Sequence, residues 1–149
     1  MHRNLILYPV LVQVALTLLI YVRLLGARAR AIRSGKVEIA RVALHQDAWP
    51  DGVVQISNSL RSQYELPVLF YVVCGVLWAL EAVGVAALVA AWLFVASRLA
   101  HAWIHLTSNR IRHRARVFAV GWWIVIAMVL LTLWQLVGST KGTFTLLIL

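Results

Sequence analysis

The sequence has few charged residues and very few acidic ones. Of its 149 residues, 13% are charged, 5 are Asp or Glu, and 62% are apolar, whereas about 25% of a soluble domain is charged. A single cysteine, Cys74, excludes an intrachain disulfide and a cysteine-based metal site. The 14 Lys and Arg residues give a net charge of +9, but they interrupt apolar runs and form no solvated face, which argues against nucleic-acid binding. The apolar excess indicates a membrane protein.

The apolar runs predict an all-α membrane protein, a four-transmembrane-helix bundle that forms one domain over residues 1–149. The spans are expected at about 5–22, 60–82, 85–106 and 117–138. The stretch Leu66–Ser97 is broken only by Glu81, and as one helix it would be about 48 Å long. A hydrocarbon core is about 30 Å thick, so the chain should fold back near Glu81–Gly84. Each arm of this hairpin then needs residues from its polar flanks, Asn58–Glu65 and Arg98–Leu106.

The loop charges predict the orientation. Segment 23–61 holds seven basic residues and segment 98–116 holds five, which leaves two for the opposite side. By the positive-inside rule, both long loops are cytoplasmic and both termini lie outside the cytoplasm. The expected location is the cell inner membrane. A cleaved signal peptide ending near Ala27-Arg28-Ala29 is the competing interpretation, and it would leave arginines on the outer side, against the same rule.

Two polar stripes accompany the hairpin. Asn58, Arg61, Ser62 and Glu65 are spaced i, i+3, i+4, i+7, which places them on one helical face. Pro67 follows closely and should unwind the turn around Arg61–Gln63, because proline lacks a backbone donor. The second stripe continues down the next span through Arg98, His101, His105, Asn109 and Arg112.

Counting from the hairpin turn places Glu65 level with His101–His105, and Arg98 about 7–8 Å deeper. An arginine inside the membrane needs a partner, and we expect that partner to be Glu65. The pair could simply fasten two helices together. A cavity lined by several arginines would instead bind a small anionic ligand and would favour the thiolate form of a thiol.

The chain resembles the MAPEG family, the membrane-associated proteins in eicosanoid and glutathione metabolism. The resemblance rests on two motifs, Arg61-Ser62-Gln63-Tyr64-Glu65-Leu66-Pro67 in the second span and Arg98-Leu99-Ala100-His101 in the third. It implies a homotrimer in membrane lipid, with glutathione as cosubstrate and a transferase or peroxidase reaction on a lipophilic small molecule at the cytoplasmic side.

The resemblance also implies the site residues. The expected glutathione-binding residues are Asn58, Arg61, Ser62, Glu65, Arg98, His101 and His105. One of three arginines at the start of the fourth span would activate the thiol, and spacing alone does not choose among Arg112, Arg114 and Arg116.

Two alternatives remain open at this point. The family's asparagine is Ser62 here and its aromatic hydroxyl is His105, which together with the apolar tail Gly138–Leu149 favours a non-catalytic lipid-binding or accessory subunit of a larger membrane complex. His101, His105 and Glu65 could also hold a metal ion. The adjacent arginines would repel a cation, so we expect no metal, and we expect no nucleic acid as a partner.

Overall fold

The computed structural model describes residues 2–35, 37–42, 44–45 and 48–148, with side chains described as far as Gly138. Every regular element in these residues is helical. In chain order they are η1 (Arg3–Ile6), α1 (Leu7–Arg33), α2 (Ile39–Val42), α3 (Asp51–Arg61), η3 (Ser62–Tyr64), α4 (Leu66–Ala79), α5 (Val85–Leu106) and α6 (Ile111–Ile148).

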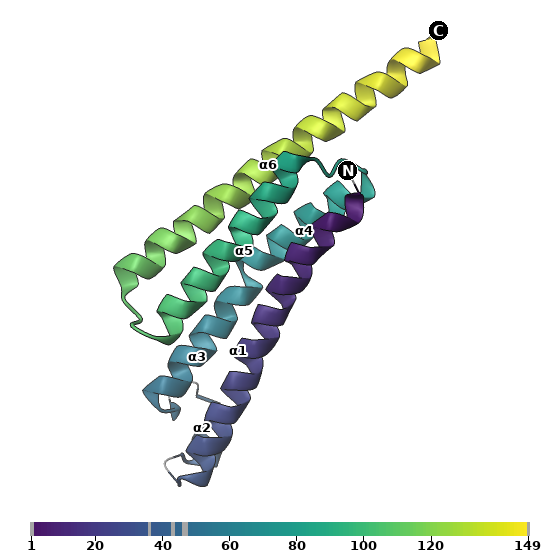
Figure 1. Cartoon of the computed structure of the whole chain (residues 1–149). Helices are drawn as coiled ribbons and strands as arrows, with labels where there is room; N and C mark the ends of the chain where they lie inside the picture. Colours follow the sequence, from purple (N-terminus) through teal and green to yellow (C-terminus); the bar gives the residue numbers. More distant parts are fainter. Residues whose placement is uncertain (1, 36, 43, 46–47, 149) are drawn as a thin grey trace.

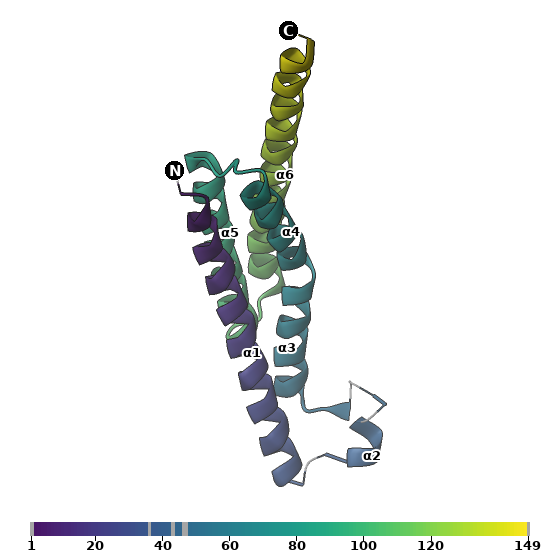
Figure 2. The same ribbon diagram turned by 90° about the vertical axis from the view of Figure 1, so that its right-hand side faces the viewer.

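Four helical stretches of the described chain are long and apolar enough to cross a membrane: Arg3–Arg33, Asp51–Ala79, Val85–Leu106 and Ile111–Gly138. The predicted all-α fold with four candidate spans is therefore confirmed. The helices run side by side, and the N-terminus, the α4–α5 connection and the C-terminal end of α6 lie toward one end of the bundle (Figures 1 and 2). Some helices continue beyond their apolar runs, because helix formation does not stop where the hydrocarbon ends.

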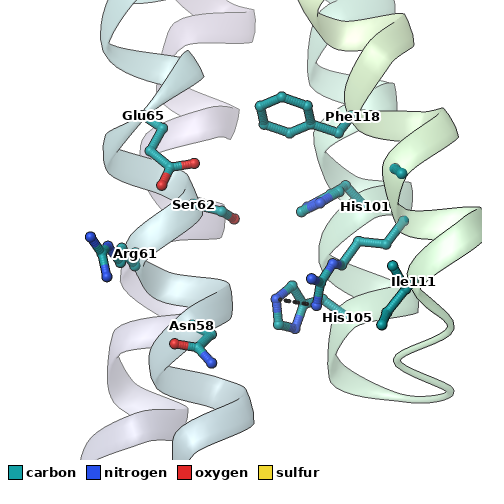
Figure 3. Close-up of a pocket in the computed structure, with 10 residues that line it drawn as sticks. Asn58, Arg61, Ser62, Glu65, His101, His105, Ile111 and Phe118 are labelled. Carbon is teal, nitrogen blue, oxygen red and sulfur yellow. Dashed lines mark hydrogen bonds between the residues drawn. The ribbon is translucent and has the colours of Figure 1, made fainter. Parts of the chain in front are cut away.

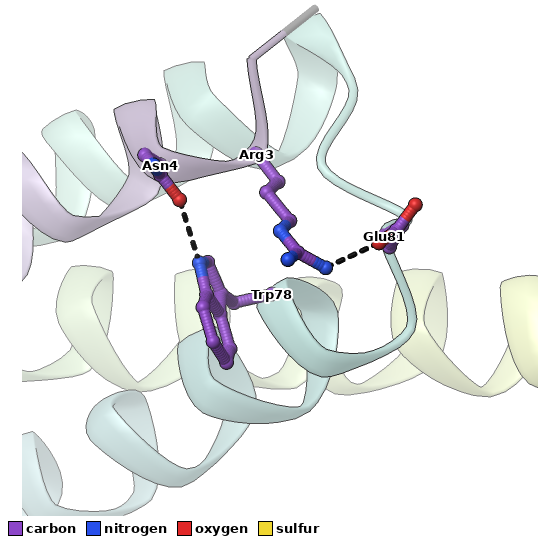
Figure 4. A network of polar contacts seen from close by, with 4 residues as sticks. All are labelled: Arg3, Asn4, Trp78 and Glu81. Atoms are coloured by element: carbon purple, nitrogen blue, oxygen red, sulfur yellow. Dashed lines mark hydrogen bonds and ion pairs between the residues drawn. The ribbon is translucent and has the colours of Figure 1, made fainter.

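The predicted hairpin turn is confirmed. Helix α4 ends at Ala79 and α5 begins at Val85, and Glu81 in the turn has a positive φ of 54°. At this end Arg3 forms an ion pair with Glu81 and lies 4.8 Å from the centre of the Trp78 ring. The indole Nε1 donates a hydrogen bond of 2.9 Å to Oδ1 of Asn4 (Figure 4). We call these four residues the terminal clasp, since they fasten the N-terminus to the α4–α5 turn.

The predicted unwinding before Pro67 is also confirmed. Between α3 and α4 the chain forms the 3-10 turn Ser62–Tyr64, and Glu65 leaves the helical region with φ −93° and ψ −93°. Pro67 then lies in the first turn of α4, where a missing N–H costs no helical hydrogen bond. The second span is thus two helices joined by a short irregular segment.

Two apolar clusters form the interior, one on each side of a polar layer. The first joins α4, α5 and α6, where Phe70 and Phe94 stack with ring centres 4.4 Å apart. The second joins α1, α3 and α5 around Leu24 and Leu60. Apart from Thr132, the buried polar residues lie near the junction of the two clusters, with Ser59 and His105 already within the second; they are Gln13, Ser59, Ser62, Gln63, Ser97, Arg98, His101 and His105. This layer positions the candidate site.

Within the layer, α1 is connected to the irregular segment by a buried amide pair. Nε2 of Gln13 donates a 3.0 Å hydrogen bond to Oε1 of Gln63. On the other side, α6 approaches α5 closely at Gly121, where an added Cβ would lie 3.0 Å from Oγ of Ser97. Both contacts hold outer helices against the polar layer.

Candidate functional site

Arg98 is the central cation of the polar layer, and only 1% of its surface is exposed. Its Nη2 donates to the Ser62 carbonyl oxygen at 3.0 Å and to the Ser62 Oγ at 3.1 Å. Among the described residues it forms no ion pair with Glu65, so the predicted partner was wrong. The broken helix explains the difference, because the Ser62 carbonyl belongs to the irregular segment and a carbonyl dipole stabilises a buried cation.

A cleft of about 450 Å³ opens between this segment and the α5–α6 hairpin. Six of the residues predicted to bind glutathione line it. Figure 3 shows four of them on one wall and the two imidazoles on the other; they are Asn58, Arg61, Ser62, Glu65, His101 and His105. The seventh, Arg98, is absent from the lining and lies behind Ser62, so it could act on a ligand only through that residue.

The cleft distinguishes among the three arginines at the start of α6. Arg114 lines it. Arg112 instead lines a separate shallow cleft formed by the α5–α6 loop, and Arg116 is exposed outside the lining. Residues two apart on a helix point about 200° apart, so Arg114 points away from Arg112 and Arg116, which are four residues apart and share the other face.

Arg114 is held by two neighbours. Its Nη1 lies 3.1 Å from Nε2 of His105 and donates a 2.9 Å hydrogen bond to Oδ1 of Asn109. A guanidinium only donates, so Nε2 of His105 accepts and the ring proton is on Nδ1. That Nδ1 is buried and has no hydrogen-bond partner among the described residues. The His105 carbonyl oxygen in turn accepts a 2.6 Å hydrogen bond from Nε2 of Gln55, which connects this group to α3.

The second polar stripe does not continue as one helical face. Helix α5 ends at Leu106, and Asn109 lies in the following turn with a positive φ of 46°. Its N–H closes the end of α5 by donating to the Ile104 carbonyl oxygen at 2.8 Å. The turn separates Asn109 and Arg112 from the face that carries the two histidines.

Sequence reasoning missed the apolar part of the cleft. Ile111, Ala115 and Phe118 complete the wall that α6 provides. Their spacing of i, i+4 and i+7, with Arg114 at i+3, is the pattern of one helical face and was available as a signal. Phe118 lies against the imidazole of His101, with ring centres 5.9 Å apart.

Chemically, the cleft combines charges of both signs with an apolar wall. Arg61 and Glu65 are exposed on one wall, while Arg114 and two imidazoles face them from the other. The hydroxyl of Ser62 already donates to the Ser59 carbonyl oxygen at 2.9 Å, so it offers a ligand only an acceptor lone pair. Cys74 is buried in the apolar cluster and is not part of the lining. No group of three metal-ligating side chains is arranged around a common point in the described part of the chain.

Comparison with known proteins gives one match. Residues 6–134 match the family model of the MAPEG family. No curated protein and no solved structure is a match for the chain.

Proposed function

Because the chain belongs to the MAPEG family, whose members are membrane proteins of glutathione and eicosanoid metabolism, we propose that it is a glutathione-dependent transferase or peroxidase. Its second substrate is a lipophilic electrophile that reaches the cleft from the bilayer. The observation that carries the proposal is the cleft itself, which brings Arg61 and Glu65 of the irregular segment opposite Arg114 of α6.

Glutathione matches the charges of this cleft. It carries two carboxylates, one ammonium group and a thiol. Arg61 is suited to a carboxylate and Glu65 to the ammonium group. Arg114, held by His105 and Asn109 at a fixed position, is suited to stabilise the thiolate, which is the nucleophilic form of the thiol.

Once the thiolate has formed, neither reaction requires a further catalytic side chain. In a transfer reaction the thiolate sulfur forms a bond to the electrophilic carbon, the leaving group departs with its electron pair, and the thiol proton passes to solvent. In a peroxidase reaction, two molecules of glutathione reduce a hydroperoxide to an alcohol and water and become glutathione disulfide. Ile111 and Phe118 provide the apolar surface against which the lipophilic substrate would lie.

The open side of the cleft supports assembly as a homotrimer. Asn58, Arg61 and Glu65 are all exposed in one copy of the chain, so a bound tripeptide would be covered on one side only. A neighbouring copy would close that side and exclude water from the thiolate. We place the cleft at the cytoplasmic face of the inner membrane, since the connections next to it carry most of the basic residues.

A non-catalytic accessory role is the second candidate, and the length of α6 favours it. This helix has 38 residues, or about 57 Å, and in Figure 1 its C-terminal end extends past the rest of the bundle. A whole membrane with its headgroups is about 40–45 Å thick. The extension could therefore contact another protein.

Thiolate absorbance and conjugation of an activated aryl halide test the main proposal in purified, detergent-solubilised protein. We expect a glutathione-dependent thiolate band near neutral pH that Arg114→Gln removes. Arg112→Gln is the matched control, because it removes the same charge two residues away and outside the cleft. Absence of the band at saturating glutathione would refute the enzymatic proposal, and co-purification of another protein would then favour the accessory role.

A further inference from the structure

A second cleft, of about 500 Å³, lies between α1, α3 and the end of α5. Its lining shares no residue with the glutathione cleft. The lining includes two exposed arginines of α1, Arg23 and Arg30. It also includes the buried side chains of Ala27, Ala31 and Val53. Small residues at i and i+4 on α1 create the hollow, because they leave room between this helix and α3. The cleft thus joins a cationic rim to an apolar floor.

The two arginines have no counter-ion there. Neither guanidinium group forms a hydrogen bond or an ion pair with any residue that the structure describes, and no Asp or Glu lines the cleft. The Arg30 guanidinium folds back along α1, since Nη1 would lie 3.5 Å from a Cβ added at Gly26. It is therefore directed along α1 toward the turn that carries Arg23, the second arginine of the cleft lining.

The position of the cleft along α1 matches the lipid headgroup layer. The apolar run Leu5–Val22 is about 27 Å long and fills most of a hydrocarbon core of about 30 Å. Arg23 follows directly, at the boundary. The backbone of Arg30 lies about 10 Å farther along the helix, but its guanidinium returns to the level of Gly26, roughly 5 Å from the boundary. The guanidinium of Arg30 and the backbone of Arg23 thus fall in the layer, several ångströms thick, where phospholipid phosphates lie.

We propose that this cleft is a binding site for an anionic phospholipid. The phosphate would be held by Arg23 and Arg30, since guanidinium groups bind phosphate oxygens in pairs. The glycerol and the first acyl carbons would cover the apolar floor around Ala27 and Val53. The apolar floor and the depth favour a lipid over free phosphate, which would use only the rim. The site is independent of the proposed glutathione chemistry.

Native mass spectrometry of the full chain released from detergent tests the proposal, with phosphatidylglycerol and phosphatidylcholine of identical acyl chains as probes. We expect the protein to retain phosphatidylglycerol preferentially. Arg23→Gln with Arg30→Gln should reduce this retention by about 25-fold, the product of two contacts worth about fivefold each. Equal retention of the two lipids by the unchanged chain would overturn the proposal.

The matched control is Arg33→Gln with Arg41→Gln, which removes two exposed charges, one from the end of α1 and one from α2, and neither residue lines the cleft. We expect it to change retention by less than about threefold. An equal loss in both double variants would show a diffuse surface charge and overturn the site. Displacement of the lipid by millimolar inorganic phosphate, with equal phosphate binding in the absence of lipid, would overturn the lipid as the ligand.

A third variant changes the shape of the cleft without changing its charge. Gly26→Leu fills the space that the Arg30 guanidinium occupies and leaves the net charge unchanged. Reduced phosphatidylglycerol retention with an unchanged thermal unfolding temperature is the expected result. Retention equal to that of the unchanged chain would count against the folded-back arginine as part of the site.

Discussion

Asn109 has two separable roles, and substitutions can remove them one at a time. Its backbone has a positive φ of 46°, and its side chain accepts a hydrogen bond from Arg114 at 2.9 Å. Glycine adopts positive φ without strain but has no side chain to accept the bond. Alanine lacks both properties. Asn109→Gly therefore tests the hydrogen bond that positions Arg114. Asn109→Ala tests this hydrogen bond and the positive-φ turn together.

The magnitudes follow from these two contacts. A hydrogen bond of this kind contributes about 1 kcal/mol, so its loss lowers the equilibrium constant between the held and released positions of Arg114 about fivefold. Left-handed backbone costs alanine about 1–2 kcal/mol. We expect Asn109→Gly to lower kcat of the glutathione reaction by up to about fivefold, with little change in the thermal unfolding temperature, because glycine adopts the positive φ more easily than asparagine and offsets the lost bond. Asn109→Ala should lower both.

The assay pairs conjugation kinetics with thermal unfolding in the same detergent. Asn109→Asp is the control, since aspartate also tolerates positive φ and keeps an acceptor oxygen. It should unfold at the temperature of the unchanged chain. A wild-type kcat in Asn109→Gly would refute the reasoning, because Arg114 would then need no support from the turn. A parallel fall of kcat and unfolding temperature in all three variants would refute it too.

Three further predictions concern the interior, each measured by thermal unfolding. Gly121→Ala should destabilise the protein, whereas Gly75→Ala should not, because a Cβ at Gly121 meets a side-chain oxygen at 3.0 Å and one at Gly75 meets nothing within 4 Å; equal shifts would contradict this packing. Gln13→Leu should cost about 1–3 kcal/mol by leaving Gln63 Oε1 without its donor, and adding Gln63→Met should recover part of the loss. Arg98→Met should unfold at a higher temperature than Arg98→Ala, since an apolar chain of similar length fills the buried space without a charge; isothermal titration should show weaker glutathione binding in both.

Much of the fold could be predicted because it depends on local pattern. Apolar length alone indicates four crossings, and the excess length of Leu66–Ser97 requires a hairpin near Glu81. Pro67 predicts the break before α4, because proline lacks the backbone N–H that would donate to a carbonyl oxygen of the preceding turn. Each of these inferences needs only the chain near the feature, and the structure confirms the crossings, the turn and the break.

The contacts inside the site could be predicted less well. Counting residues from the hairpin turn gave the depth of Arg98 along its helix, but it could not show that the cation would reach the Ser62 carbonyl in the broken helix instead of Glu65. The selection of Arg114 depends on the rotation of α6 relative to α5. That rotation is set by the turn, where Asn109 has positive φ, and periodicity within either helix carries no information about it.

The terminal clasp has a consequence for how the chain enters the membrane. Arg3 and Glu81 are 78 positions apart in the sequence, and they meet only if the start of the first span and the α4–α5 turn emerge on the same side of the bilayer. Inversion of either one would separate them by a hydrocarbon core of about 30 Å. Arg3 is made first, but its ion pair with Glu81 forms only after the second span, Asp51–Ala79, has been made. The clasp thus closes only in chains in which these two segments have reached the same side of the bilayer.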